Sequence, residues 1–366
     1  MKLGIYCNFG PGIVSGVLQT GGSEYVIENI SKLLIKDYNY NVSISAFNYN
    51  KETVYNDINL IPCGKNNKLI DHINSYDHIF IYSDSFWGMS NILDNIKQIK
   101  PRITLALVGA YFLKSHPEYL KILKKNIDKF NLVVHSSLTP DYLFCKNNNL
   151  PVSIVSNGID KKEFETNNIN FREKYNIKKK YIILNIANYF YGKGQESLGL
   201  INKELKKHLK DFIIVQISSS IKYPYEERFL NRAKRNFGND KCLFLRNIPR
   251  EDVVAAFRNS DVLLNVSGKE VSPIIMLESL AAGLPFISLG VGDVFKYPGM
   301  IINTVIEDSK GYKIIDKITI EMYAKEIYLI LKNDNLRNNL IKKRQEVIEK
   351  YDWKNIIHRY KGIFEK

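Results

Sequence analysis

The sequence is poor in the residues and runs that mark secreted, metal-bound or membrane-spanning proteins. Four cysteines occur in 366 residues, and their spacing matches neither a zinc site nor a redox pair. No apolar run reaches the about 18 residues that a membrane-spanning helix needs. The N-terminus resembles a first strand rather than a signal peptide. We therefore expect free thiols and a cytoplasmic protein.

Motifs that bind metals or activate a nucleophile are also missing. The sequence contains no Asp-x-Asp pattern, which often holds a divalent ion on a diphosphate, and no Gly-x-Ser-x-Gly nucleophile turn. No cluster of His, Cys and acidic residues has the spacing of metal ligands. We therefore predict no metal site and no cofactor.

The charge is strongly positive and unevenly distributed. The formal net charge is +14; residues 1–160 carry 15 basic and 13 acidic groups, and the remainder carries 37 and 25. Such a surplus attracts acidic small ligands, nucleic acid or an anionic membrane surface. No nucleic-acid motif accompanies it, so we expect no nucleic-acid partner, and peripheral contact with the inner face of a membrane stays open.

Strand-like runs alternate with helical patterns along the whole chain, which is typical of parallel α/β sheets. The length favours two domains. The polar stretch 160–180 is the expected junction, and the apolar residues of the tail recur at helical spacing. The predicted strands are 3–6, 42–47, 78–82, 103–108, 132–135 and 152–155 in the first half, and 181–186, 212–217, 242–245, 262–266 and 285–288 in the second.

Two acids, Glu270 and Glu278, surround a helix-start signal. Ser272 is a favourable N-cap and Pro273 suits the first helical position, so Glu270 falls on the loop after a strand and Glu278 inside the next helix. A helix N-terminus attracts phosphate, and Glu278 lies about 7.5 Å beyond Pro273 at 1.5 Å per residue. The spacing fits a diphosphate and its ribose, although isolated acid pairs of this kind are often only solvated.

Three further loops follow predicted strands. Gly21 and Gly22 open the first helix, where paired glycines let backbone N–H groups approach a phosphate. Lys193 stands between two glycines, where it can reach an anion. Asn157 and Gly158 form a dipeptide that is typical of a turn. Each loop alone also fits a flexible or solvated connection.

Together these stretches resemble glycosyltransferase family 4, the retaining, metal-independent enzymes of GT-B fold. The specific part is the E-x7-E spacing of Glu270 and Glu278, with Ala-Gly-Leu-Pro ending at Pro285. The resemblance implies two Rossmann-like domains facing across a cleft, with a C-terminal helix crossing back to the first domain. We place the domains at 1–162, on the acceptor side, and 163–345, which binds the nucleotide sugar, and the helix at 346–366.

The resemblance also assigns roles. Glu270 would bind the hydroxyls of the donor sugar, Glu278 the ribose, and Lys193 the diphosphate, with Glu270 and Lys193 as the catalytic pair. Asn188 stands where the family usually has an arginine, and we keep it in the donor site. The other donor-binding positions that the resemblance implies are backbone groups of Gly21, Gly22, Asn247, Ile248, Ser272, Pro273 and Ile274.

The implied activity is transfer of a hexose from a nucleotide-diphosphate donor, a UDP-sugar by preference. The acceptor would be a glycan, lipid-linked or protein-glycan molecule in bacterial-type surface polysaccharide or glycoconjugate assembly. Because Asn188 lacks the charge of the usual arginine, a catalytically weak nucleotide-sugar or polyanion-binding protein of the same fold remains the alternative.

Overall fold

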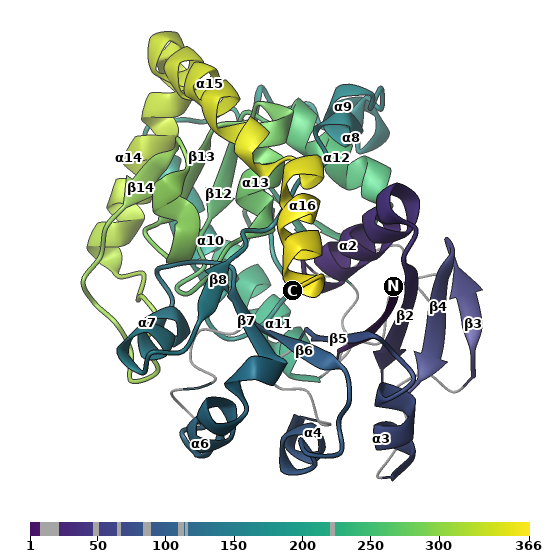
Figure 1. The fold of residues 1–366 in the computed structure, drawn as a ribbon. Helices are drawn as coiled ribbons and strands as arrows, with labels where there is room; N and C mark the ends of the chain where they lie inside the picture. The colour runs from purple at the N-terminus through teal and green to yellow at the C-terminus, as the bar shows by residue number, and fades with distance from the viewer. Residues whose placement is uncertain are drawn as a thin grey trace. The chain divides into compact units, whose positions relative to one another are not determined.

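The computed structural model describes residues 1–7, 22–46, 51–63, 67–82, 89–108, 113, 116–219 and 224–366 (Figure 1). The described chain divides into two compact units. The N-terminal unit comprises Met1–Gly158 and Trp353–Lys366, and the C-terminal unit comprises Ile159–Asp352. The sequence placed the divisions after residues 162 and 345, whereas the structure divides after Gly158 and Asp352, because Ile159 and Ile348 are both buried in the second unit's core.

In the part of the chain that is described, the sheet of the N-terminal unit has eight strands in the order β3-β4-β2-β1-β5-β6-β7-β8. Every pair is parallel except β3 with β4. The central strands are apolar on both faces because helices cover both faces of such a sheet. The strands are β1 (Lys2–Tyr6), β2 (Asn41–Ala46), β3 (Thr53–Tyr55), β4 (Ile58–Pro62), β5 (His78–Ile81), β6 (Arg102–Leu107), β7 (Phe130–Val134) and β8 (Val152–Ile154).

The helices of this unit include the last one of the chain. They are α2 (Gly22–Tyr38), α3 (Asn67–Ile73), α4 (Met89–Asp94), α6 (Glu118–Lys125), α7 (Pro140–Asn147) and α16 (Trp353–Phe364). Helix α16 buries a stripe at helical spacing that includes Ile356 and Tyr360. Its His358 Nδ1 lies 2.7 Å from the Tyr38 hydroxyl of α2, and its Ile363 carbonyl accepts a hydrogen bond of 3.1 Å from Asn131. The tail is thus integral to the N-terminal unit.

The chain passes between the units at two neighbouring points. The Ile159 N–H donates to the Tyr351 carbonyl at 2.8 Å, and Ile159 forms a parallel bridge with Asp352. Next to this bridge, the Trp353 ring covers Gly158 so closely that a Cβ there would lie 2.4 Å from Cδ2 of the ring. The sequence favoured a turn at Asn157–Gly158; the structure has no turn there, and the glycine instead makes room for Trp353.

Within the described residues, the C-terminal unit has one sheet, in which all strands are parallel. Its strand order is β11-β10-β9-β12-β13-β14. Its strands are β9 (Tyr181–Ile186), β10 (Phe212–Ser218), β11 (Cys242–Arg246), β12 (Val262–Asn265), β13 (Phe286–Leu289) and β14 (Met300–Ile302). Its helices are α8 (Lys161–Glu165), α9 (Phe171–Lys174), α10 (Leu198–Leu205), α11 (Pro224–Phe237), α12 (Arg250–Asn259), α13 (Ile274–Ala282), α14 (Lys317–Lys332) and α15 (Asp334–Ile348).

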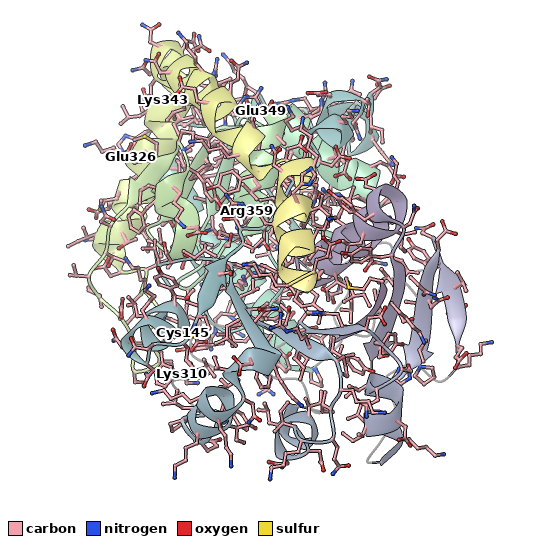
Figure 2. All side chains as sticks on the ribbon, viewed as in Figure 1. Cys145, Lys310, Glu326, Lys343, Glu349 and Arg359 are labelled. Carbon is pink, nitrogen blue, oxygen red and sulfur yellow. The ribbon has the colours of Figure 1, made fainter. Side chains whose placement is uncertain are left out.

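One hydrophobic core joins this sheet to its helices. Leu264 of β12, Met276 of α13 and Ile327 of α14 all belong to it and are fully buried. The outermost helix, α15, buries Ile348 and exposes charged side chains such as Lys343, labelled in Figure 2. The predicted pair of parallel α/β domains is thereby confirmed, and each unit has its own core.

Two expectations from composition can also be compared with the structure. The four cysteines are free, with Cys7 and Cys145 buried and the other two partly exposed. No helix in the described residues is long and apolar enough to cross a membrane.

Candidate functional site

The carboxyl edge of the C-terminal sheet collects most of the predicted site residues. Lys193 lies on the loop after β9, Asn247 follows β11, and Glu270 follows β12 and precedes α13. Because all strands of this sheet are parallel, their carboxyl ends meet at one edge. Ligands of such sheets bind beyond this edge. The site is therefore built from loops that a rigid sheet positions.

Lys193 and Glu270 form the centre of this arrangement. The Lys193 ammonium nitrogen lies 2.6 Å from Oε1 of Glu270. The Lys193 side chain is 25% exposed and the Glu270 side chain 14% exposed. The pair is therefore largely shielded from solvent but still accessible to a ligand. The second oxygen of Glu270 makes no hydrogen bond within the described residues. The pair offers a cation and a hydroxyl acceptor side by side.

The backbone fixes the two loops against each other. The Gly268 N–H donates to the Gly192 carbonyl at 2.8 Å. Gly194 has a φ of +71°, and a Cβ there would lie 2.2 Å from the Val266 carbonyl oxygen. Both facts exclude a side chain at Gly194 without movement of the loop. The glycine pattern around Lys193 thus serves close packing against the end of β12.

Helix α13 begins one residue later than the sequence predicted. Pro273, with φ −70° and ψ 118°, is the N-cap, and Ile274 is the first helical residue. Ser272, the predicted cap, therefore precedes the helix, and no side chain caps it. The ring of proline fixes φ but leaves ψ free, and the extended ψ of Pro273 makes this residue the cap, whose carbonyl accepts a bond from the Met276 N–H at 3.1 Å. The helix ends at Gly283, as predicted.

The start of α13 suits an anion. Its first turn contains no acidic residue, and the first N–H groups of any helix have no acceptor within it. The helix dipole adds about half a positive charge at this end. Glu270 lies on the loop that leads into this start, so the loop carries a carboxylate and ends at the positive end of a helix dipole.

Glu278 lies in the middle of α13 and is nearly buried. Its Oε1 is bound by the Nη1 group of Arg250, the first residue of α12. The same guanidinium binds Glu163 of α8 with two bonds of 2.8 Å each. Sequence reasoning found Glu278 but missed Arg250 and Glu163. The only available signal was Arg250's place at a helix start after β11, and nothing in the sequence pairs it with Glu163.

Asn188 is held by the surrounding loops. Its side-chain oxygen accepts a 3.0 Å hydrogen bond from the Ser219 N–H, and its carbonyl accepts one of 2.7 Å from Gln195. The bond from Ser219 ties the loop after β9 to the loop after β10, and the bond from Gln195 lies within the loop after β9. The neutral amide therefore has a structural use at this position and brings no charge to the site.

The loop after β11 is strongly bent at Asn247. This residue has a φ of +51°, in the left-handed region that asparagine tolerates, and its N–H donates to the Ser218 carbonyl at 2.9 Å. Ile248 is buried, whereas the Asn247 side chain is exposed. The bend directs the chain into Pro249 and α12, and the predicted contact of this backbone with a base stays a prediction.

The predicted glycine loop belongs to the N-terminal unit. Gly22 is the first residue of α2 and is exposed. Gly21 lies outside the described residues. Their predicted contact with phosphate is therefore not part of the geometry of the C-terminal unit.

A cationic and aromatic cluster adjoins the Lys193 loop, and the sequence did not predict it. The Tyr191 and Tyr312 rings meet edge to face at 5.0 Å, and Asp308 accepts a hydrogen bond from the Tyr191 hydroxyl. Lys269 lies 5.0 Å from the centre of the Tyr312 ring, and Lys310, labelled in Figure 2, lies 4.8 Å from that of Tyr191. Burial lowers the pKa of Lys269 below its usual range.

In the described part of the chain, no group of three or more His, Cys, Asp or Glu side chains is placed to hold a metal ion. Positive groups at this edge come instead from Lys193, Lys269 and the start of α13. The arrangement fits a small anion with polar hydroxyl groups attached to it.

Comparison with known proteins shows which proteins this chain is similar to. Residues 167–347 match the family model of glycosyl transferases, group 1. The chain is 22% identical to an uncharacterized glycosyltransferase of Methanocaldococcus jannaschii, MJ1069, over 94% of this chain and 95% of that protein. An uncharacterized glycosyltransferase of Haemophilus influenzae is 26% identical over half of this chain and 48% of its own length. The family model and these relatives support glycosyltransferase group 1.

Solved structures agree on the fold. The fold of this chain matches that of the trehalose-6-phosphate synthase OtsA with a TM-score of 0.77 at 13% identity, over all of this chain and 99% of that one. Sucrose-phosphate synthase from Thermosynechococcus elongatus gives a TM-score of 0.74 at 13% identity, over 100% and 98%. The two-domain α/β fold is thus that of GT-B glycosyltransferases. The donor roles given above to single residues stay predictions.

Proposed function

We propose that this chain is a retaining glycosyltransferase that moves a hexose from a nucleoside-diphosphate sugar to an acceptor hydroxyl. The observation that carries the proposal is the 2.6 Å pair of Lys193 and Glu270, with Glu270 on the loop that leads into the uncapped start of α13. A diphosphate and the sugar attached to it need a cation and a hydroxyl acceptor in this proximity. The segment around the pair lies within the stretch that matches glycosyl transferases group 1.

The chemistry requires stabilisation of a leaving group. The bond between the sugar's anomeric carbon and the diphosphate breaks, the acceptor oxygen bonds to that carbon, and the acceptor proton leaves with the diphosphate. Charge develops on the diphosphate, and Lys193 and the start of α13 would stabilise it electrostatically. Glu270 would bind the sugar hydroxyls, Glu278 the ribose, and the backbone at Asn247 and Ile248 the base. No step needs a metal ion.

The uridine nucleotide is the preferred donor. HepE of Anabaena, whose structures contain UDP and UDP-glucose, has a TM-score of 0.73 or 0.72 with this chain at 12% identity, and a structure described as trehalose-6-phosphate from E. coli, with a TM-score of 0.73 at 12% identity, is bound with UDP-2-fluoro glucose. The acceptor we propose is a glycan, a lipid-linked sugar or a protein glycan of surface polysaccharide assembly. The basic surplus of residues 161–366 would favour work at an anionic membrane surface from the cytoplasmic side.

A second candidate is a nucleotide-sugar binder without efficient transfer. Asn188, bound to the Ser219 N–H, favours it, because a second cation on the diphosphate is missing at this position. Transfer and simple binding are separable by experiment. A thermal-shift screen of the purified chain with UDP, GDP and their sugar conjugates reports binding, because a ligand of the native state raises the melting temperature.

Release of nucleotide from the conjugate that binds, with and without a chelator, then reports catalysis. We expect stabilisation by a UDP-sugar and chelator-resistant release. Stabilisation without release would favour the binder, and no stabilisation by any nucleotide would contradict both candidates.

A further inference from the structure

An arginine lies between two carboxylates in the C-terminal unit, in an arrangement here termed the carboxylate clamp: Glu163 of α8, Arg250 of α12 and Glu278 of α13. Nε and Nη2 of Arg250 each donate to a different oxygen of Glu163 at 2.8 Å. The remaining nitrogen, Nη1, donates to Oε1 of Glu278. The guanidinium also lies 5.7 Å from the centre of the Phe164 ring. Three helices thus converge on one planar cation.

The clamp restricts Glu278 more than an ordinary ion pair would. A two-bond contact with Glu163 fixes the plane of the guanidinium as well as its position. The third nitrogen is then presented to Glu278 in one direction. The Glu278 side chain is only 7% exposed, and removing the charged partner of a buried carboxylate is costly.

The two oxygens of Glu278 are therefore unequal. Oε1 is held by Arg250, while Oε2 makes no hydrogen bond within the described residues. A carboxylate with one oxygen anchored can offer the other as an oriented hydroxyl acceptor. Two neighbouring hydroxyl groups on one ring, as in a ribose, are the chemistry that such an acceptor recognises.

We propose that Arg250 and Glu163 are positioning residues for Glu278. They determine how much more tightly the site binds a ribose than the same ring without its 2′ and 3′ hydroxyl groups. The inference rests on the proposed function, which gives Glu278 the ribose. Arg250 acts through Glu278, and Glu163 acts through Arg250. Loss of either should affect recognition of the hydroxyls while leaving the contacts of the diphosphate intact.

The test compares two nucleotides that differ only in these hydroxyls. Calorimetry gives the Kd of UDP and of 2′,3′-dideoxy-UDP for the wild type, Arg250→Gln and Glu163→Gln, and the ratio of the two constants measures discrimination. Because an oriented hydrogen bond to a charged group contributes about 1.5–3 kcal/mol, the wild-type ratio should be about tenfold or more. We expect each variant to reduce that ratio by about threefold or more. The ratio for Arg250→Lys should lie between those of the two glutamine variants and that of the wild type.

The chain offers a matched control in Arg258 at the other end of α12. It also contacts α8, by donating to the Phe164 and Glu165 carbonyls, but does not belong to the clamp. Arg258→Gln should keep the wild-type ratio, which separates positioning of Glu278 from loosening of the contact between α8 and α12. If Arg250→Gln fails to fold by circular dichroism, Glu163→Gln and Arg250→Lys still report the ratio.

Each outcome has one meaning. An unchanged ratio in the clamp variants overturns the inference, and so does tighter UDP binding by Arg250→Gln, which would show that Arg250 competes with the ligand. A wild type that binds UDP without discriminating the hydroxyls overturns the inference alone. A wild type that binds neither UDP nor GDP overturns the proposed function, and the inference with it.

Discussion

Lys193 and Glu270, 77 positions apart in sequence, are joined by a 2.6 Å contact at the carboxyl edge of one sheet. Two glycine loops hold them there, through the bond between the Gly268 N–H and the Gly192 carbonyl. In the ligand-free chain the two charges neutralise each other. A diphosphate would compete with Glu270 for the lysine, so the carboxylate becomes available for a sugar when the phosphate binds.

Lys193→Ala should weaken binding of UDP. Removal of one cation from a diphosphate costs about 1.5–3 kcal/mol in a partly desolvated site, or about tenfold to a hundredfold in Kd. Calorimetric titration with UDP measures this change. Lys203→Ala removes an exposed lysine from α10 and serves as the control. Equal affinities of Lys193→Ala and the wild type would remove Lys193 from the diphosphate site.

Gly158→Ala should destabilise the chain by about 1–3 kcal/mol, the usual cost of forcing an extra group into packed surroundings. The added Cβ would lie 2.4 Å from the Trp353 ring, which is itself buried. Gly362→Ala is the matched control in the following helix α16, because nothing lies within 4 Å of a Cβ there. Alanine in the helix should raise stability by about 0.5–1 kcal/mol.

Thermal denaturation of both glycine variants measures the difference. A Gly158→Ala melting temperature equal to that of the wild type would show that Trp353 does not depend on this glycine.

Acidification should destabilise the N-terminal unit through His78. Burial, with a further contribution from Arg102, lowers the pKa of this histidine to about 4. Between about pH 4 and 6.5 the unfolded chain therefore binds a proton that the folded chain does not, and stability falls as the pH falls through this window. At pH 4.5 the loss amounts to about 2–3 kcal/mol.

His78→Gln removes this titration. Melting temperatures at pH 7 and 4.5 should differ less for the variant than for the wild type. Identical pH dependence of the two proteins would mean that His78 is protonated in the folded state without cost.

The sequence was informative about regular structure that buries apolar residues. The central strands of both sheets and the apolar stripe of α16 follow directly from the period of the apolar residues. The same reasoning missed β4, although its buried Ile58 and Leu60 alternate with partly exposed residues, and it missed the three-residue edge strands β3 and β14. Edge strands depend on pairing with a neighbour, and such pairing leaves little trace in the chain's own sequence.

The parts of the candidate site that could be predicted are those where the local backbone requires one particular residue type. The Gly-Lys-Gly loop and the helix ending at Gly283 are of this kind, because glycine is required by close approach or by a positive φ. The cap of α13 was misplaced by one residue, since Ser272 and Pro273 are both good helix starters. Arg250 could not be found, because its function comes from three helices that meet only in the folded unit.

The most direct test of the account is the rate of nucleotide release from the UDP-sugar that stabilises the wild type, measured for Glu270→Ala. If Glu270 holds the donor sugar during transfer, loss of its carboxylate removes a charged hydrogen bond, and the rate should fall by about a hundredfold or more with an unchanged melting temperature. Glu307→Ala, an exposed acid of the same unit, should retain the wild-type rate. A near-normal rate for Glu270→Ala would contradict the account.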